Sequence, residues 1–279
     1  MSEMQNIQWF PGHMTKTKRQ IQANLKLVDA VAEIIDARIP VSSRNPDLNG
    51  IIQSKPRVIL LNKCDMANRT ATKMWIDHFA KQGITAIAVD CKSGKGLNKF
   101  PQAVNTVLSE KINRLKSKGM KNPMMRIMIV GIPNVGKSSL INRLAKRSAA
   151  GVQNKPGYTR GEQFIKVNND FILLDTPGVL PMNYDNRDTA INLALVGSVR
   201  EDILPNEDLA VYLIKYLSKN YPNALENRFG ITDLSNFEEV IRLICQKRGL
   251  LNDNERAYSL LLKEFKEGKL GPISLEKSL

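Results

Sequence analysis

Residues 131–138, with the sequence GIPNVGKS, have the spacing of a phosphate-binding loop. They match the pattern G-x-x-x-x-G-K-[ST], in which two glycines let backbone N–H groups turn toward phosphate oxygens at the start of a helix. Lys137 would lie against the β- and γ-phosphates as part of the catalytic machinery, and the Ser138 hydroxyl would bind Mg²⁺. An apolar run precedes the loop and a helix-forming run follows it, as the pattern requires. The predicted contact residues are Asn134, Val135, Gly136, Lys137, Ser138 and Ser139.

The sequence NKCD at residues 62–65 predicts that the base of the nucleotide is guanine. The aspartate of this N-K-x-D pattern, Asp65, can accept hydrogen bonds from guanine N1–H and from the exocyclic amine. Adenine offers neither donor there, so a buried Asp65 would be left unpaired and ATP would be rejected. Asn62 would brace the loop, and the aliphatic stem of Lys63 would lie over the ring. The motif follows the apolar run 58–61, which strengthens the match.

A second loop is expected beside the base. Asp90, Cys91 and Lys92 follow the predicted strand 84–89, where proteins that bind GTP place a loop whose backbone N–H contacts guanine O6. Serine is common at the position of Cys91, but a contact made by the backbone tolerates that change.

Two further motifs predict the parts that respond to the γ-phosphate. Residues 175–178, DTPG, follow the apolar run 171–174; Asp175 would reach Mg²⁺ through water, and the Gly178 N–H would sense the γ-phosphate. Thr159 lies between DTPG and the phosphate loop, where a first-switch threonine would complete the Mg²⁺ shell and take part in catalysis. In isolation, DTPG could be a strand-ending turn and Thr159 a turn residue. Their order behind a phosphate loop favours the two switches.

The order of the motifs is unusual. In ordinary GTPases the phosphate loop comes first and the base-reading motif last, whereas here NKCD stands well upstream of GIPNVGKS. Ligands in open parallel α/β sheets bind beyond the carboxyl ends of the strands, so polar segments at several strand ends can converge on one site. The predicted strands that end in such segments are 31–35, 58–61, 84–89, 127–130 and 171–174. We predict an α/β P-loop GTPase fold with a circularly permuted motif order.

From about residue 206 onward, apolar residues recur at helical spacing without strand-like runs. We therefore predict two domains, a GTPase domain over residues 1–200 and a small all-helical domain over residues 205–279. Within the first, helices are expected between the strands, over residues 70–81, 97–116 and 137–146.

Charge is distributed unevenly along the chain, whose net charge is +14. Residues 205–279 contain 11 of the 41 basic residues and 11 of the 27 acidic ones, so the whole excess belongs to residues 1–204. The basic residues are densest over 111–126, with a second group at 16–19. Such an excess suggests a polyanionic partner such as nucleic acid, the alternative being a merely solvated basic surface.

Other features of the composition point to a cytoplasmic protein. The three cysteines are odd in number and lack metal-ligand spacing, which favours a reducing compartment. No apolar run approaches the ~18 residues needed to span a bilayer, and the polar first residues carry no signal-peptide core. We expect no membrane partner, and nothing in the sequence demands more than a monomer.

With this order of motifs the sequence resembles the circularly permuted GTPases and, among them, the bacterial ribosome biogenesis GTPase A family of the YlqF type. The resemblance covers essentially the whole chain. Besides the permuted motifs and the helical C-terminal part, it rests on WFPGHM at residues 9–14, DARIP at 36–40 and SSRNP at 42–46. The residues leave open whether DARIP and SSRNP bind RNA or only shape the end of a strand.

The resemblance implies an enzyme that hydrolyses GTP to GDP and phosphate, binds the immature large ribosomal subunit in the GTP state and leaves after hydrolysis. It implies GTP or GDP and Mg²⁺ as cofactors, and rRNA and ribosomal proteins as partners. The helical domain would contact RNA; because that domain is neutral here, we expect the basic GTPase domain to share the contact. Two alternatives are a GTPase acting on another RNA target and a non-catalytic RNA-binding protein with a relic nucleotide site. Intact Lys137, Ser138, Thr159 and Asp175 argue against the relic site.

The hydrolysis machinery departs from the usual pattern at Val179, which stands where a water-orienting glutamine would follow DTPG. We expect Val179 to pack. The resemblance places a histidine of WFPGHM near the γ-phosphate, which is His13; from the residues alone, a capping or packed histidine would be favoured. His78 lacks such a context and is expected to be structural. Asn134 stands where several GTPases without the glutamine use an asparagine to help bind K⁺, so K⁺ is expected beside the phosphates.

Overall fold

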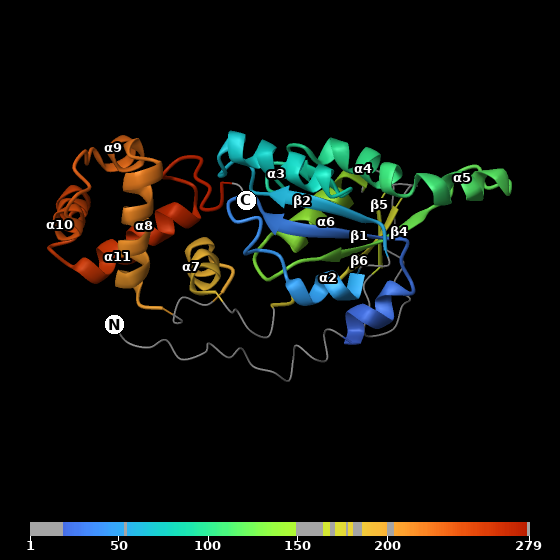
Figure 1. The fold of residues 1–279 in the computed structure, drawn as a ribbon, viewed down its shortest axis with the longest axis horizontal. Coiled ribbons are helices and arrows are strands. Elements are labelled where there is room, and N and C mark those ends of the chain that lie inside the picture. The colour runs from blue at the N-terminus through green and yellow to red at the C-terminus, as the bar shows by residue number, and fades with distance from the viewer. Residues whose placement is uncertain are drawn as a thin grey trace.

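The computed structural model describes residues 19–52, 55–148, 164–167, 171–176, 178–180, 186–199 and 204–277. These ranges contain a six-stranded sheet of order β3-β2-β1-β4-β6-β5 (Figure 1). Its strands are β1 (Ala30–Asp36), β2 (Arg57–Asn62), β3 (Thr85–Ala88), β4 (Met125–Val130), β5 (Phe164–Val167) and β6 (Phe171–Asp175). All neighbours pair in parallel except β5 and β6. The predicted parallel α/β sheet is confirmed, and β5 is an antiparallel edge strand that the sequence did not predict.

Strand β1 lies at the centre of the sheet and is buried along its whole length. Because strand side chains alternate between faces, Ala30, Ala32 and Ile34 belong to one apolar cluster, whereas Val31 and Ile35 belong to clusters on the other side. This burial on both faces explains why the strands are continuous apolar runs in the sequence.

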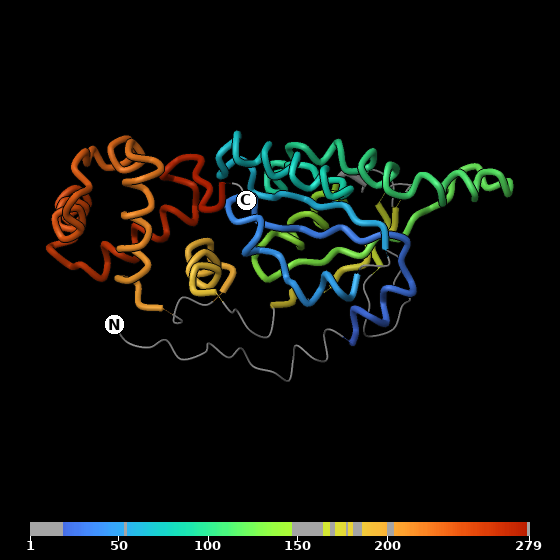
Figure 2. Tube along the Cα trace, in the orientation of Figure 1, coloured from blue at the N-terminus to red at the C-terminus, as the bar shows by residue number. Residues whose placement is uncertain are grey.

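Helices cover both faces of the sheet. The helices of this part of the chain are α2 (Pro46–Ile52), α3 (Arg69–Lys81), α4 (Phe100–Val107), α5 (Ser109–Ser117) and α6 (Lys137–Ser148). The single helix expected over 97–116 was wrong in detail: a 3-10 turn at Leu97–Lys99 leads into α4, and the backbone leaves helical geometry at Leu108 before α5. Helix α5 buries none of its own residues and projects from the sheet end of the molecule (Figure 2).

The C-terminal part is helical, as predicted. It contains α8 (Asn206–Asn220), α9 (Asn223–Phe229), α10 (Phe237–Arg248) and α11 (Asn254–Lys266). Helix α7 (Arg187–Val196) precedes residue 200 but packs against α8 and α11, beside the helical part in Figure 1. Asparagine and aspartate side chains cap the starts of α7, α10 and α11, and left-handed glycines end α7, α9 and α10. None of the helices in the described ranges has the length and apolar character needed to cross a bilayer.

Residues 268–277, here called the tail, return from α11 to the sheet domain (Figure 2). The Ile273 N–H donates to the carbonyl of Met66 over 2.9 Å, and the Trp75 indole donates to the carbonyl of Glu276 over 3.0 Å. The Glu276 carboxylate accepts hydrogen bonds from the backbone N–H groups of Val41 and Ser42, although burial raises its pKa. The tail therefore fixes the helical part against the sheet.

Candidate nucleotide site

The phosphate loop connects the end of β4 to the start of α6, the arrangement that directs backbone N–H groups toward an anion. Three of its residues adopt positive φ, Gly131 at 158°, Asn134 at 61° and Gly136 at 106°. Gly136 is also sterically required, because a Cβ there would lie 2.3 Å from the Asn62 Nδ2 atom. Ser138 and Ser139 are exposed at the first turn of the helix, while Val135 is buried beneath the loop.

The side chain of Lys137 folds back toward the start of the phosphate loop. Its Nζ donates to the carbonyls of Gly131 over 3.1 Å and Ile132 over 2.9 Å. Burial lowers the pKa of Lys137 to about 8, and the nearby Asp175 carboxylate opposes that shift. A Cβ on Gly178 would lie 2.9 Å from Nζ, so the residue predicted to sense the γ-phosphate lies directly beside the lysine.

Oxygen ligands suited to Mg²⁺ come from both sides of this loop. Asp175 ends β6, and burial raises its pKa while Lys137 lowers it. Ser138 is exposed at the start of α6, and hydroxyl and carboxylate oxygens are the hard ligands that Mg²⁺ prefers. Thr176 is instead buried and donates to the Ile129 carbonyl over 2.6 Å, which anchors the start of the second switch to β4.

The base-reading loop, residues 62–65, follows β2. The buried side chain of Asn62 donates from Nδ2 to the Val135 carbonyl over 2.6 Å, and its Oδ1 accepts from the Cys91 N–H over 2.9 Å. Asn62 thus braces the loop, as predicted, and also ties it to the phosphate loop. Asp65 is exposed, so the burial that would make it reject adenine must come from the bound base itself.

The second base loop is held by its own side chains. Asp90 is buried, and its Oδ1 accepts from the Lys92 N–H over 2.8 Å. Cys91 is buried and contacts Asn62 through its backbone, which explains why cysteine can replace serine there. Lys92 is exposed, and its carbonyl accepts from the Arg143 guanidinium of α6, a second link between the base side and the phosphate side.

Val179 packs, as expected. It is 2% exposed, in an apolar cluster with side chains of β1, β4 and α2. Its N–H donates to the Gly131 carbonyl over 3.3 Å, and its carbonyl accepts from the Asn45 amide over 3.0 Å. The backbone after DTPG is therefore held by Gly131 of the phosphate loop and by Asn45 of SSRNP.

The DARIP and SSRNP segments are mostly buried. Arg38 is 1% exposed and pairs with Asp36, and Ser42, Ser43 and Asn45 are buried as well. Of the two roles left open by the sequence, this burial favours the shaping of the strand end over direct contact with RNA.

The structure brings together most of the predicted site, through the contacts of Asn62 with Val135 and Cys91 and the proximity of Lys137 to Asp175 and Gly178. His13 and Thr159 lie outside the described residues. Sequence reasoning missed Asn45, because no local pattern links it to the second switch. It also missed the ion pair between Lys63 and Asp36, although the position of both at neighbouring strand ends was a usable signal.

Nucleotide affinity should fall as pH rises above about 8, by up to about tenfold per pH unit. The reason is that phosphates bind the protonated form of Lys137, whereas burial favours the neutral form in the free site. Calorimetric titration of GDP from pH 7 to 9, in two buffers of different ionisation enthalpy, would measure both the affinity and the proton uptake. Lys137→Met is the control, because it removes the group that titrates: its affinity should be lower and should not change over this pH range. A flat profile in the unmodified protein would contradict this prediction.

Comparisons with known proteins agree with this geometry. A family model described as "50S ribosome-binding GTPase" matches residues 126–246. A ribosome biogenesis GTPase A from Priestia megaterium is 42% identical over 279 residues, covering 97% of this chain and 96% of the relative. A GDP-bound YlqF structure matches with a TM-score of 0.66 at 30% identity, and the match covers 93% of this chain and 99% of the YlqF chain. The GNP-bound YlqF of Thermotoga maritima has a TM-score of 0.64 at 31% identity, covering 94% and 98%.

The relatives match along nearly the whole chain, and the two solved structures share its fold. This chain belongs to the ribosome biogenesis GTPase A family.

Proposed function

We propose that this GTPase binds the immature large ribosomal subunit in its GTP state and leaves the particle after hydrolysis. Membership of the family gives a GTP-hydrolysing enzyme of ribosome biogenesis. The finer proposal assigns GTP binding to residues 1–200 and part of the RNA contact to residues 205–279. It also places the protein in the cytoplasm, a reducing compartment in which its three free cysteines would stay reduced. There the protein would act as a monomer.

One contact carries the proposal that nucleotide state reaches the helical part. The Asn134 amide of the phosphate loop donates to the Gly197 carbonyl over 2.8 Å. Gly197 ends α7, which packs on α8 and α11. A rearrangement of the phosphate loop would therefore alter the position of a helix that belongs by packing to the helical part.

The roles of the site residues follow from their positions. Lys137 would bind the phosphates, and Gly178, beside its Nζ, would offer its N–H to the γ-phosphate. Ser138, Asp175 and Thr159 would hold Mg²⁺, which would neutralise charge on the phosphates. Because Val179 is buried and cannot act on water, we assign the orientation of the attacking water to His13.

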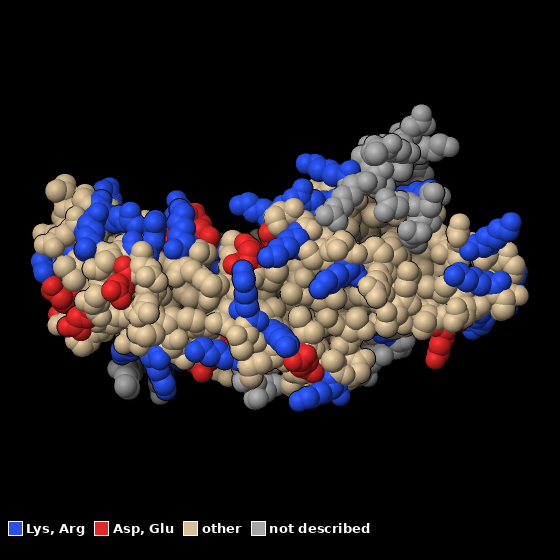
Figure 3. Space-filling view, turned by 90° about the horizontal axis from the view of Figure 1, so that it is seen from above, with Lys and Arg blue, Asp and Glu red and all other residues tan. Residues whose placement is uncertain are grey.

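A basic surface supports an RNA partner. Helix α5 and the segment after it carry Arg114, Lys116, Lys118 and Lys121, all exposed, and Lys111 is paired with Asp29. Figure 3 shows Lys and Arg side chains projecting at the α5 end of the molecule and along the face seen from above. Because α5 buries none of its own residues, its basic side chains are available to phosphates of an RNA helix.

Sedimentation tests the proposed function. With a non-hydrolysable GTP analogue the protein should migrate with large-subunit particles, and with GDP it should remain at the top of the gradient. A variant with Arg114, Lys116 and Lys118 changed to Gln should need lower salt to stay bound, because it neutralises fewer phosphates. Equal co-sedimentation in both nucleotides would contradict release by hydrolysis.

His13→Ala should lower particle-stimulated GTP turnover by about 100-fold, the usual contribution of a group that assists proton transfer or positions water. GDP affinity should not change, because the assigned role lies in hydrolysis. His78→Ala is the matched control: His78 lies on α3, where its ring nitrogen is 2.8 Å from the Gln82 amide, outside the site. Full stimulated turnover in His13→Ala would remove His13 from the mechanism.

Turnover should be faster in KCl than in NaCl at equal ionic strength, because the Asn134 side-chain oxygen is proposed to bind K⁺ beside the phosphates. The Asn134 nitrogen is already engaged with Gly197, which leaves the oxygen as the ligand. Asn134→Ala should remove the difference between the two salts. Equal rates in the unmodified protein would rule out a role for K⁺.

A further inference from the structure

The lysine of the base-reading loop, Lys63, forms an ion pair with the buried carboxylate of Asp36. Lys63 adopts a φ of 59°, and its Nζ lies 2.9 Å from Oδ2 of Asp36. Asp36 ends β1 and stands opposite Asn62 in the parallel register of β1 and β2. The ammonium group is therefore fixed by Asp36, which limits the positions that the aliphatic stem of Lys63 can adopt beside the base-reading loop.

Asp36 is charged despite complete burial. Its Oδ1 accepts from Nε of Arg38 over 3.0 Å and its Oδ2 from Nη2 over 2.8 Å, a bidentate pair. Burial alone would raise the pKa of Asp36, but the charges of Arg38 and Lys63 outweigh it and hold the pKa well below its usual range. The carboxylate is thus a permanent anion shared by two cations.

Arg38 uses its remaining donor on the helical part. Its Nη1 donates to the carbonyls of Phe265 over 3.4 Å and Lys266 over 3.3 Å, and its guanidinium lies 5.6 Å from the centre of the Phe265 ring. These are the last residues of α11, the end of a helix at which the helix dipole favours a cation. A continuous series of contacts therefore joins the base-reading lysine to the end of α11.

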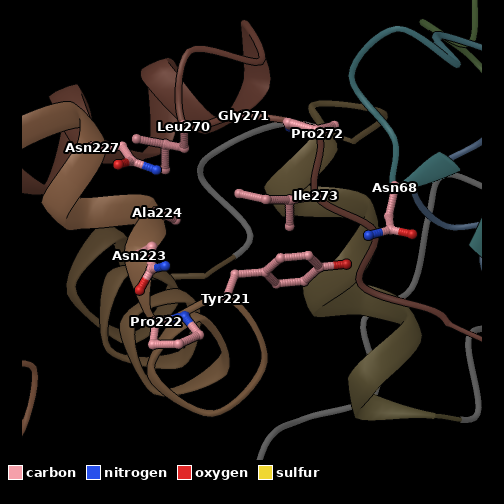
Figure 4. Close-up of a pocket in the computed structure, with 10 residues that line it drawn as sticks. All are labelled: Asn68, Tyr221, Pro222, Asn223, Ala224, Asn227, Leu270, Gly271, Pro272 and Ile273. Atoms are coloured by element: carbon pink, nitrogen blue, oxygen red, sulfur yellow. The ribbon is translucent and has the colours of Figure 1, made fainter. Parts of the chain in front are cut away.

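The tail supports the same loop from a second direction. The carbonyl of Met66, next to Asp65, accepts from Ile273, and the Asn68 N–H donates to the Ser274 hydroxyl over 3.1 Å. The Leu275 N–H donates to the Arg38 carbonyl over 2.9 Å. A cavity of about 340 Å³ is lined by Asn68 on one side and by Tyr221 and Ile273 on the other. Figure 4 shows the side chains that line it.

We propose that Asp36 is a positioning residue for guanine nucleotide binding, which acts by fixing Lys63, and that Arg38 makes this position depend on the helical part. Binding energy at the base is thereby coupled to the packing of α11 and the tail. The coupling is reciprocal, so a nucleotide that orders the base-reading loop also stabilises the tail contacts. This coupling acts through the residues that bind the base and is separate from the switch that responds to the γ-phosphate. It requires only GTP and GDP binding, whatever particle the protein acts on.

Asp36→Asn tests the proposal, because it keeps the shape of the side chain and removes the charge. Affinity for a fluorescent GDP analogue should fall about tenfold, the equivalent of one charge-assisted hydrogen bond. Glu33→Gln is the matched control: Glu33 is a buried carboxylate on the same strand that pairs with Arg44 and Arg57 and has no contact with the base-reading loop. Both variants should be less stable to heat, and only Asp36→Asn should lose affinity. Equal affinities in the two variants would overturn the proposal.

A double-mutant cycle separates positioning from general damage. Lys63→Met keeps an apolar stem and loses the ammonium, so it should also weaken GDP binding, and Asp36→Asn should add little to it. Fully additive losses would mean that Asp36 does not act through Lys63. If Asp36→Asn fails to fold, the affinity of Lys63→Met for GDP tests the proposal by itself. Unchanged affinity in that variant would contradict the proposal, because Asp36 is proposed to act by fixing the Lys63 ammonium.

Hydrogen exchange measures the link to the helical part. In the unmodified protein, GDP should slow exchange at the N–H groups of Ile273 and Leu275, which bond to Met66 and Arg38. At saturating GDP, Lys63→Met should show less of this protection. Protection that is equal in both proteins would restrict Asp36 to a structural role.

Discussion

The nucleotide site depends on the two hydrogen bonds made by the side-chain amide of Asn62. Its two polar atoms join the base-reading loop to the phosphate loop at Val135 and to the second base loop at Cys91. These three loops come from separate parts of the chain, and in a permuted order no short covalent connection holds them together. The requirement for glycine at 136 follows from the same amide, since a side chain there would occupy the position of Nδ2.

Some of the basic residues that make this chain positively charged are paired with buried carboxylates inside the sheet domain. Two buried carboxylates of β1 each bind two cations, Glu33 with Arg44 and Arg57, and Asp36 with Arg38 and Lys63. Removing one partner from such a cluster is costly, because the remaining charge stays buried. Part of the positive excess of residues 1–204 thus serves the fold, and the exposed residues of α5 are better candidates for contact with a polyanion.

Much of the fold and site could be predicted because the relevant information is local. Apolar runs bounded by polar motifs identify the central strands, and parallel pairing places their ends at one edge. The parts that could not be predicted depend on distant partners. Asn45 meets Val179 across 134 residues, and Arg38 meets Phe265 across 227. Strand β5 is only four residues long and forms by pairing with β6, and the break at Leu108 interrupts an apolar pattern that continues on both sides.

The pairing of β1 with β4 has a consequence for how the protein folds. Residues 30–107 contain the base side of the site and residues 125–180 the phosphate side, each a contiguous stretch with its own strands and helices. The two stretches meet along β1 and β4, whose partners lie about a hundred residues apart in sequence. Contacts of such separation form late, because the entropy of closing the intervening chain must be overcome first. A ligand that touches both stretches stabilises only the joined state, so the nucleotide favours the completion of the central sheet.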